Sequence, residues 1–166
     1  KKSLIIPEII LGYMIKSYKF SKYKNKKIFL PTNLYISNIS KNIINKINYN
    51  LNLFNSINLV KDLVSEPANV LTPENYAKKC LKLNIKGLKI KILNKTQLKK
   101  IGMTALLGVS QGSSNEPRVV VFEWNIKKNK KPILLAGKGV TFDTGGISLK
   151  PSSGMEEMIT DMGGSA

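Results

Sequence analysis

The segment Gly137-Lys-Gly-Val-Thr-Phe-Asp-Thr-Gly-Gly-Ile-Ser-Leu-Lys150 decides how the rest of the chain is interpreted. An apolar run, Pro132-Ile-Leu-Leu-Ala136, leads into it and predicts a buried strand. The glycine-rich segment therefore follows the carboxyl end of a strand, where open α/β sheets bind their ligands. Charged side chains near a buried strand end are costly unless they are paired or bind a metal. We expect the active site here and in the residues up to Asp161-Met-Gly-Gly164.

Lys138, Asp143 and Asp161 supply the donors of a divalent metal site if this segment folds back on itself. A Lys ligand must be neutral, and a nearby dication together with burial lowers the lysine pKa from its usual value of about 10.4. Lys150 would then be a second, protonated lysine that stabilises a developing oxyanion. The alternative is two ordinary surface lysines, with Asp143 capping a turn and Asp161 acting as a helix N-cap.

Asp143-Thr-Gly145 is also the tripeptide of aspartic proteases, in which paired carboxylates activate water. That fold is all-β and needs a second such tripeptide. Here Gly146 follows, the surroundings are α/β and two lysines bracket the motif, so we disfavour this interpretation. Further on, we expect Met155 and Met158 to fill the core and Glu156 and Glu157 to be exposed on a short helix.

The composition restricts the chemistry and the partners. The 166 residues carry a formal net charge of +17, no His and a single Cys. Without His, a metal site must use carboxylates, Lys or backbone. Cys80 has no intrachain disulfide partner, which fits a reducing compartment, and we expect it to be a small apolar residue on a helix. No apolar run approaches the roughly 18 residues that span a membrane. The chain begins with Lys1 and ends at Gly-Gly-Ser-Ala166, which suggests an internal fragment of a longer protein.

The basic charge raises nucleic acid as a partner. We favour compositional drift, because Arg118 is the only Arg and the Lys excess comes with an excess of Ile and Asn. The basic segment from Phe20 to Lys27 also has two interpretations. It is either a phosphate-binding patch, with Tyr18, Phe20 and Tyr23 stacking on bases, or a solvated connection with aromatic anchors, which we favour.

Helices alternate with strands along the chain, which predicts an α/β fold. Pro7 to Lys19 and Ser40 to Ser65 have helical periodicity, and the second helix has a candidate break near Asn50. Thr72 and Pro73 predict an N-cap and first turn of another helix. The other expected elements are strands at Ile28–Leu30, Asn33–Ser37, Leu88–Leu93, Arg118–Trp124 and Pro132–Gly137, a short helix from Gln97 to Ile101, and a basic hairpin-like connection from Asn125 to Lys131.

Three motifs resemble the leucyl (cytosol) aminopeptidase family, its bacterial members especially. They are Gly137 to Pro151 with Met155-Glu-Glu-Met and Asp161-Met-Gly-Gly, Asp62-Leu-Val-Ser-Glu-Pro-Ala-Asn-Val-Leu-Thr-Pro73, and Gly102 to Ser113 with Pro117-Arg118. The resemblance runs from about Glu8 to the end. It implies the end of an N-terminal α/β domain (1–57), a linker helix and interdomain segment (58–73), and the first half of an α/β catalytic domain with a mixed sheet (74–166).

The resemblance also implies a role for each site residue. Lys138 and Asp161 would be ligands of the more exchange-prone of two metal ions, which also receives the substrate's amino group. Asp143 would bridge both ions. Lys150 would be the catalytic lysine that polarises the scissile carbonyl and stabilises the gem-diolate, and Met158 would line the S1 pocket. Lys138, Asp143, Lys150, Met158 and Asp161 would therefore all take part in substrate binding.

The implied enzyme uses Mn²⁺ or Zn²⁺, removes N-terminal leucine and similar residues from peptides, forms a homo-hexamer and is cytoplasmic, with no membrane partner. In the family, an Asn-Thr-Asp-Ala-Glu-Gly-Arg segment supplies the other acidic ligands and an Arg that holds a bicarbonate as general base, and this sequence lacks it. We therefore expect this fragment to bind metals weakly and to be inactive alone. The alternatives are a basic DNA-binding or architectural protein on the same fold, and the product of a degraded gene.

Overall fold

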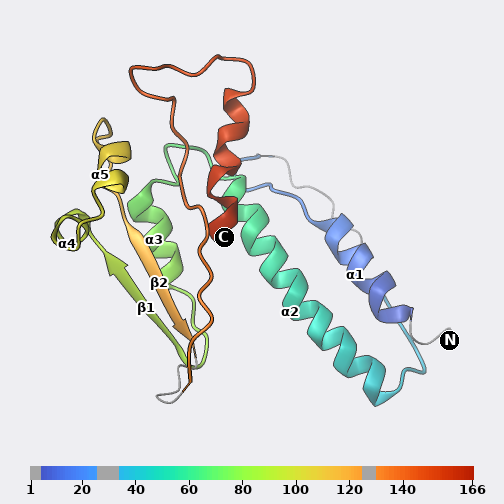
Figure 1. Ribbon diagram of the computed structural model, residues 1–166. Coiled ribbons are helices and arrows are strands. Elements are labelled where there is room, and N and C mark those ends of the chain that lie inside the picture. The colour runs from blue at the N-terminus through green and yellow to red at the C-terminus, as the bar shows by residue number, and fades with distance from the viewer. Residues whose placement is uncertain (1–4, 26–33, 125–129) are drawn as a thin grey trace. The chain divides into compact units, whose positions relative to one another are not determined.

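A computed structural model describes residues 5–25, 34–124 and 130–166 (Figure 1). The chain divides into two compact units, residues 1–65 and 66–166, and each is described by itself. The α/β class expected from the sequence is confirmed, since helices in both units accompany a small sheet in the second. Among the residues described, none of the helices combines the length and apolarity that a membrane crossing requires.

In the first unit, the described residues form two helices, α1 (Ile6–Ser17) and α2 (Lys41–Val64), that pack side by side and run in the same direction. Their contacts advance together along both helices. The Asn50 amide donates to the Pro7 carbonyl oxygen at 2.9 Å, and the Tyr18 hydroxyl, just after α1, donates to Asp62 Oδ1 at 2.7 Å. The break expected near Asn50 is absent, because this buried amide is satisfied by α1 and tertiary contact overrides its weak helix propensity.

The two short strands expected in the first unit are not found where the structure describes the chain. Residues 34–37 form no strand, so the expectation of a strand over 33–37 is wrong for them, and no neighbouring strand is described there with which they could pair. The strand expected at 28–30 lies outside the described residues. A short alternating run predicts a strand only where a partner strand is available, since its hydrogen bonds are made between strands.

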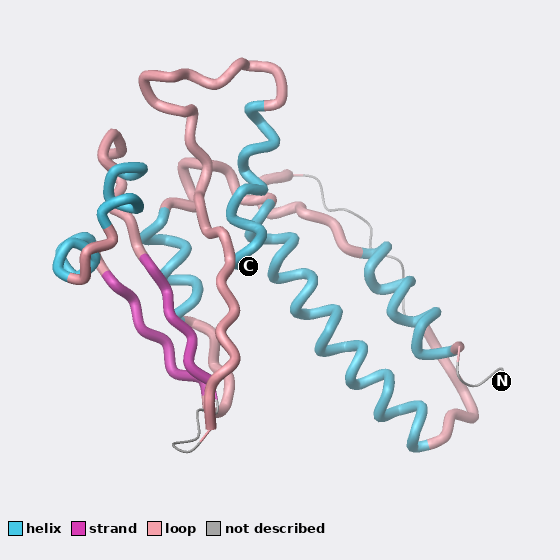
Figure 2. Tube along the Cα trace, viewed as in Figure 1, coloured by secondary structure: helices cyan, strands magenta, loops and turns pink. Residues whose placement is uncertain are grey.

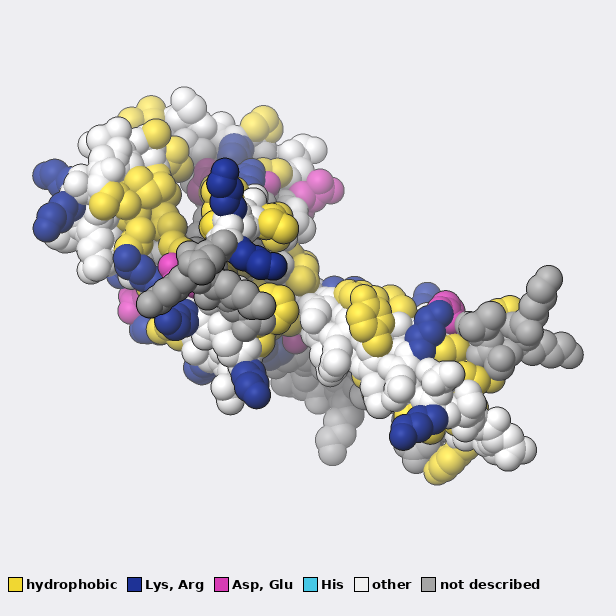
Figure 3. All heavy atoms as spheres, turned by 60° about the horizontal axis from the view of Figure 1, so that its bottom comes forward, with side chains coloured by type: hydrophobic (Ala, Val, Ile, Leu, Met, Phe, Trp, Pro, Cys, Tyr) yellow, Lys and Arg dark blue, Asp and Glu magenta, His cyan; other side chains and the backbone are white. Residues whose placement is uncertain are grey.

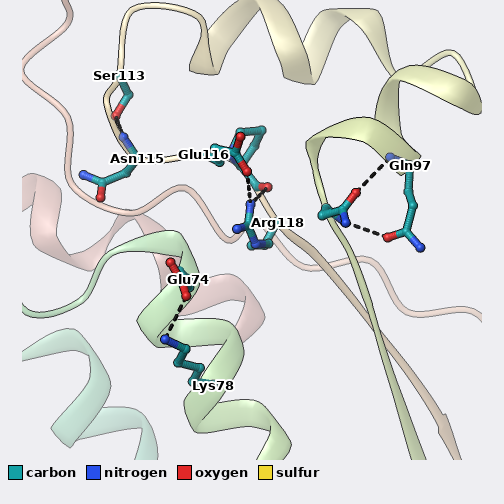
Figure 4. Close-up of polar contacts among 9 residues, drawn as sticks. Glu74, Lys78, Gln97, Ser113, Asn115, Glu116 and Arg118 are labelled. Atoms are coloured by element: carbon teal, nitrogen blue, oxygen red, sulfur yellow. Dashed lines mark hydrogen bonds and ion pairs between the residues drawn. The ribbon is translucent and has the colours of Figure 1, made fainter.

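The second unit is built on an antiparallel pair of strands, β1 (Leu88–Leu93) and β2 (Val119–Trp124). Their register places Leu88 opposite Trp124 and Leu93 opposite Val119. Both strands lie where the sequence predicts them, although β2 begins one residue later than expected. Arg118 precedes β2 and donates to Glu116 and to the Pro117 carbonyl instead (Figure 4). The described residues thus contain two antiparallel strands rather than the larger mixed sheet expected.

Three helices accompany this sheet, and their ends follow capping chemistry. Thr72 caps α3 (Pro73–Leu81) by accepting from the Asn75 amide, as predicted. The helix α4 (Lys95–Lys100) begins two residues before its expected start, because Asn94 and Gln97 form a reciprocal capping box (Figure 4). The helix α5 (Thr104–Ser110) follows directly. Side chains buried in this unit include Leu71, Tyr76, Ala77, Cys80, Leu98 and Met162. Cys80 therefore lies buried on a helix, as expected.

The strand expected at 132–137 is wrong. Residues 131–144 form an extended path without ladder hydrogen bonds (Figure 2), and Ile133, Leu134 and Leu135 are 90%, 89% and 89% exposed. The apolar run is not buried because no described strand pairs with it and no described helix covers it. The chain then turns through 145–154 into the 3₁₀ helix η2 (Met155–Ser165), which Gly154 begins in a left-handed conformation. Glu156 and Glu157 are exposed there, as expected.

Candidate active site

The glycine-rich segment and the end of η2 meet backbone to backbone. A Cβ atom at Gly137 would lie 2.2 Å from the Gly164 carbonyl oxygen and 2.7 Å from the Ser165 Cα. One at Gly139 would lie 2.9 Å from Ser165 Oγ. Real Cβ atoms do not make contacts as short as the first two, so only glycine permits this approach. The fold-back anticipated from the sequence is therefore present, and Lys138 lies between the two glycines that allow it.

This approach places Lys138 against Asp161. The Lys138 Nζ lies 2.9 Å from Asp161 Oδ2, across 23 residues of sequence. Asp161 lies inside η2, six residues after its start, so it is not the helix N-cap. The ion pair is partly solvated, because the two side chains are 58% and 26% exposed. The Lys138–Asp161 ion pair therefore contributes little to stability. Its importance is that it brings an amine and a carboxylate together.

A second lysine–aspartate pair forms within the loop itself. Lys150 Nζ lies 3.0 Å from Asp143 Oδ1 and 3.2 Å from the Asp143 carbonyl oxygen. The same Oδ1 accepts the Gly145 amide at 2.8 Å, so Asp143 also caps a turn. Gly145 has φ +93°, and a Cβ there would lie 2.4 Å from the Ser148 carbonyl oxygen. Glycine is thus required at this position on two counts.

The two pairs act on each other electrostatically. The Lys150 hydrogen bond is the main cause that holds the pKa of the Asp143 carboxyl below its ordinary value. Partial burial opposes this, while the Gly145 amide and the charges of Lys150 and Lys138 lower the pKa further. The field of Lys138 therefore reaches Asp143 although Lys138 pairs with Asp161. The four side chains singled out in the sequence form two ion pairs that the charge of Lys138 couples, and these four residues are the charged cluster of the candidate site.

The donor set of this cluster is compatible with a divalent metal. Two ligands of one tetrahedral Zn²⁺ ion, each about 2.1 Å from it, lie roughly 3.4 Å apart. Lys138 Nζ and Asp161 Oδ2 are 2.9 Å apart, so a small separation of the two side chains would let both bind one ion. Both contacts that the described residues make to the Asp143 carboxylate are on Oδ1, so Oδ2 is the oxygen available to a metal. Within the described ranges, however, no group of three or more His, Cys, Asp or Glu side chains is placed to hold an ion. The residues present fit part of a metal site.

Two further residues at this site carried no signal in the sequence. The Tyr76 hydroxyl on α3 lies 3.0 Å from Ser165 Oγ at the end of η2. Ser165 Oγ also donates to the Met162 carbonyl oxygen at 2.9 Å, and Met162 is fully buried. Met158, the residue expected in the substrate pocket, is half-buried on the same helix. Tyr76 and Ser165 are 89 residues apart, so no local pattern connects them.

The basic surface has no single centre on the face that Figure 3 shows. Within each unit, Lys and Arg side chains lie singly or in small groups among uncharged ones. The aromatic side chains of the basic segment after α1 make contacts inside the first unit. The Tyr18 hydroxyl bonds to Asp62, and the rings of Phe20 and Tyr23 meet edge to face at 5.8 Å. Tyr18 is thus attached to α2, whereas Tyr23 is 53% exposed and is not a core anchor. These contacts within the first unit do not favour a nucleic-acid surface.

Comparisons with known proteins connect the cluster with one family. A family model described as "Cytosol aminopeptidase family, catalytic domain" matches residues 58–166. A probable cytosol aminopeptidase of Wolbachia pipientis is 43% identical over 183 residues, covering 100% of this chain and 36% of the relative. A probable cytosol aminopeptidase of Rhizobium meliloti is 57% identical over 109 residues, covering 65% of this chain and 22% of the relative. The chain spans about a third of the length of such curated relatives or less.

Solved structures match over nearly all of the chain. The cytosol aminopeptidase of Coxiella burnetii superposes with a TM-score of 0.82 at 25% identity, covering 96% of this chain and 33% of that one. The bottromycin maturation enzyme BotP in complex with Mn superposes with a TM-score of 0.78 at 29% identity, covering 99% and 34%. A solved structure similar to this chain therefore contains Mn.

Proposed function

Because the chain belongs to the cytosol aminopeptidase family, we propose that it forms part of a metal-dependent aminopeptidase that releases N-terminal residues, leucine and similar ones, from peptides. The observation that carries this proposal is the convergence of Lys138 with Asp161 and of Lys150 with Asp143 at one fold-back. In this proposal Lys138, Asp143 and Asp161 hold metal, and Lys150 is catalytic. Met158 borders the site for the substrate's first side chain.

Two divalent ions, Mn²⁺ or Zn²⁺, would supply an activated water for attack on the peptide bond. Lys138 would hold one ion only as a neutral amine, so it would first release to solvent the proton that it now donates to Asp161. Asp143 offers Oδ2 to the ions while the Gly145 amide fixes its other oxygen. These residues would also bind the substrate's amino end. Bicarbonate, as general base, would be held by residues that this chain does not contain.

Lys150 would act on the scissile carbonyl. Its ammonium has three N–H donors, and in the described residues two are directed at Asp143. The third can donate to a carbonyl oxygen on which negative charge develops. Asp143 keeps the ammonium in place, which avoids reorganisation at the moment of reaction. In an enzyme that contains this chain, removing such a donor should lower kcat about 10²–10³-fold.

The wider assignments belong to the same proposal. A homo-hexamer, a cytoplasmic location and the division into an N-terminal domain (1–57), a linker (58–73) and a catalytic domain (74–166) are what membership of this family makes us expect. The chain on its own is proposed to bind metal weakly and to lack peptidase activity, because the acidic cluster within the described residues is incomplete.

Titration of the 166-residue chain with Mn²⁺, followed by the EPR signal of free Mn²⁺, tests the ligand assignment. Lys138→Met and Asp161→Asn should each abolish saturable binding, whereas Lys89→Met, an exposed lysine on β1, should leave it unchanged. Binding by Asp161→Asn as tight as by the unmodified chain contradicts the assignment. Metal-dependent release of leucine from leucine amide by this chain alone contradicts the proposed inactivity.

A further inference from the structure

A hydrogen-bond chain connects α3 to the end of η2. Ser165 Oγ donates its one proton to the Met162 carbonyl oxygen at 2.9 Å. The contact between Tyr76 and Ser165, 3.0 Å between their hydroxyl oxygens, must therefore be donated by the tyrosine. Tyr76 is buried, and burial raises the pKa of its phenol. The hydroxyl stays protonated and remains a donor at neutral pH. Tyr76 thus fixes the position of the Ser165 side chain.

Ser165 in turn lies against the glycine-rich segment. Its Oγ would be 2.9 Å from a Cβ at Gly139, and its Cα 2.7 Å from one at Gly137. Lys138 lies between these glycines, and Asp161 precedes Ser165 by four residues on the same short helix. The position of Ser165 therefore sets how closely the backbone that carries Lys138 approaches the helix that carries Asp161.

We propose that Tyr76 and Ser165 are positioning residues for the metal site: the Tyr76–Ser165 hydrogen bond holds η2 against residues 137–139 and so sets the Lys138–Asp161 separation. The inference rests on the proposed function for its metal-binding consequence, because neither residue is itself a ligand. Residues that orient ligands without touching the metal typically change its affinity about 10–100-fold when they are replaced. Tyr76→Phe keeps the ring and removes only the donor. Ser165→Ala removes the acceptor.

The test compares Mn²⁺ affinity in the 166-residue chain by the same EPR titration. Tyr76→Phe and Ser165→Ala should each raise the Kd about 10-fold or more. The double variant should raise it no further than Ser165→Ala, because that change already removes the Tyr76–Ser165 bond together with the bond to Met162. Ser165→Thr, which keeps the hydroxyl, should restore binding. Tyr49→Phe changes an exposed tyrosine on α2. Ser110→Ala removes a comparable bond to a carbonyl three residues earlier. Both controls should match the unmodified chain.

Two readouts separate positioning from general destabilisation. Leu98→Val alters the fully buried core of the same unit and should lower the melting temperature without changing the Kd. Nuclear Overhauser contacts between Gly137 and Gly164–Ser165 should be present in the unmodified chain and weakened in Tyr76→Phe. Tyr76→Phe could unfold the unit, which would be seen as a loss of circular dichroism. In that case the Mn²⁺ Kd values of Ser165→Ala and Ser165→Thr test the positioning role.

The outcomes for the two proposals are distinguishable. Saturable Mn²⁺ binding that is the same in Tyr76→Phe, Ser165→Ala and the unmodified chain overturns the positioning role and leaves the proposed function intact. Absence of Mn²⁺ binding in the unmodified chain contradicts the ligand assignment. The positioning inference is then judged by the Overhauser contacts alone, and it is overturned if they persist unchanged in Tyr76→Phe and Ser165→Ala.

Discussion

The buried carboxylate of Glu66 gives the sharpest stability prediction. Its side chain is 2% exposed, and Oε1 lies 2.7 Å from Lys79 Nζ on α3. Lys79→Met keeps most of the aliphatic stem and removes the ammonium. Breaking a buried ion pair by removing one partner costs up to about 3–5 kcal/mol, because the buried charge that remains loses the attraction of that partner. Lys79 is itself 33% exposed, so water screens part of the attraction. We expect a loss of about 2–3 kcal/mol in the free energy of unfolding.

The neighbouring residue on the same helix provides the matched control. Lys78 pairs with Glu74 one turn earlier, at 2.7 Å (Figure 4), and both side chains are more than half exposed. Lys78→Met is the same chemical change at an adjacent position, and we expect it to be indistinguishable from the unmodified chain. Equilibrium urea unfolding measures both variants. The fluorescence of Trp124, the only tryptophan, reports on the second unit, because its indole N–H donates to the Lys86 carbonyl oxygen.

A neutral partner tests the electrostatic origin of the loss. Adding Glu66→Gln to Lys79→Met removes the buried charge, so the double variant should be more stable than Lys79→Met alone. Equal effects of Lys79→Met and Lys78→Met would refute the reasoning. So would a double variant that is no more stable than Lys79→Met, because the loss would then come from packing of the lysine stem.

Three further predictions use other parts of the chain. Gly137→Ala should weaken Mn²⁺ binding about 10-fold or more, because its Cβ would lie 2.2 Å from the Gly164 carbonyl oxygen. Tyr18 should titrate late in an NMR pH series, since partial burial and then the hydrogen bond to Asp62 raise its pKa to about 12. Asp62→Asn should lower that pKa, while burial still holds it above its ordinary value. The protonated Tyr18 hydroxyl contributes to the free energy of unfolding fully below about pH 10, and this contribution is lost as the pH rises through about 12. Thr72→Ala should cost about 1 kcal/mol in urea unfolding, because it removes the side-chain cap of α3.

Each of these has a control in the chain. Gly108→Ala adds a Cβ where no atom lies within 4 Å, so Mn²⁺ binding as weak as in Gly137→Ala would contradict the clash argument. The Tyr18 signal is identified by its loss in Tyr18→Phe, and a pKa unchanged by Asp62→Asn would contradict the role of the carboxylate. For the cap, Thr72→Ser keeps the hydroxyl and should be close to the unmodified chain.

Local chemistry made much of the fold predictable from the sequence. Helix α3 begins where Thr72 and Pro73 place it, and β1 has the bounds that its alternation predicts, because both signals depend on residues within one element. Helix α4 begins two residues before Gln97, because Asn94 caps it and Gln97 completes the capping box as the third helical residue. The continuity of α2 through Asn50 depends on the Pro7 carbonyl, 43 residues away, and no local pattern contains that information.

The fold-back expected after residue 137 is present, whereas the strand expected at 132–137 is absent. One physical reason explains both results. A strand needs hydrogen-bonding neighbours, and apolar side chains are buried only against other surfaces. Among the described residues, no strand pairs with the run 133–135 and no surface covers it. The side chains that remain exposed are therefore Ile133, Leu134 and Leu135. The glycines and the charged side chains of the fold-back lie within its own segment, and the contribution from outside it is the Tyr76 hydroxyl that contacts Ser165. The glycines at 137, 139 and 164 allow the two backbone segments to approach closely. Within the same thirty residues, Lys138 pairs with Asp161 and Lys150 pairs with Asp143. The site is therefore ordered by close backbone approach and by ion pairs rather than by a sheet, and the local sequence could predict it where it could not predict the strand.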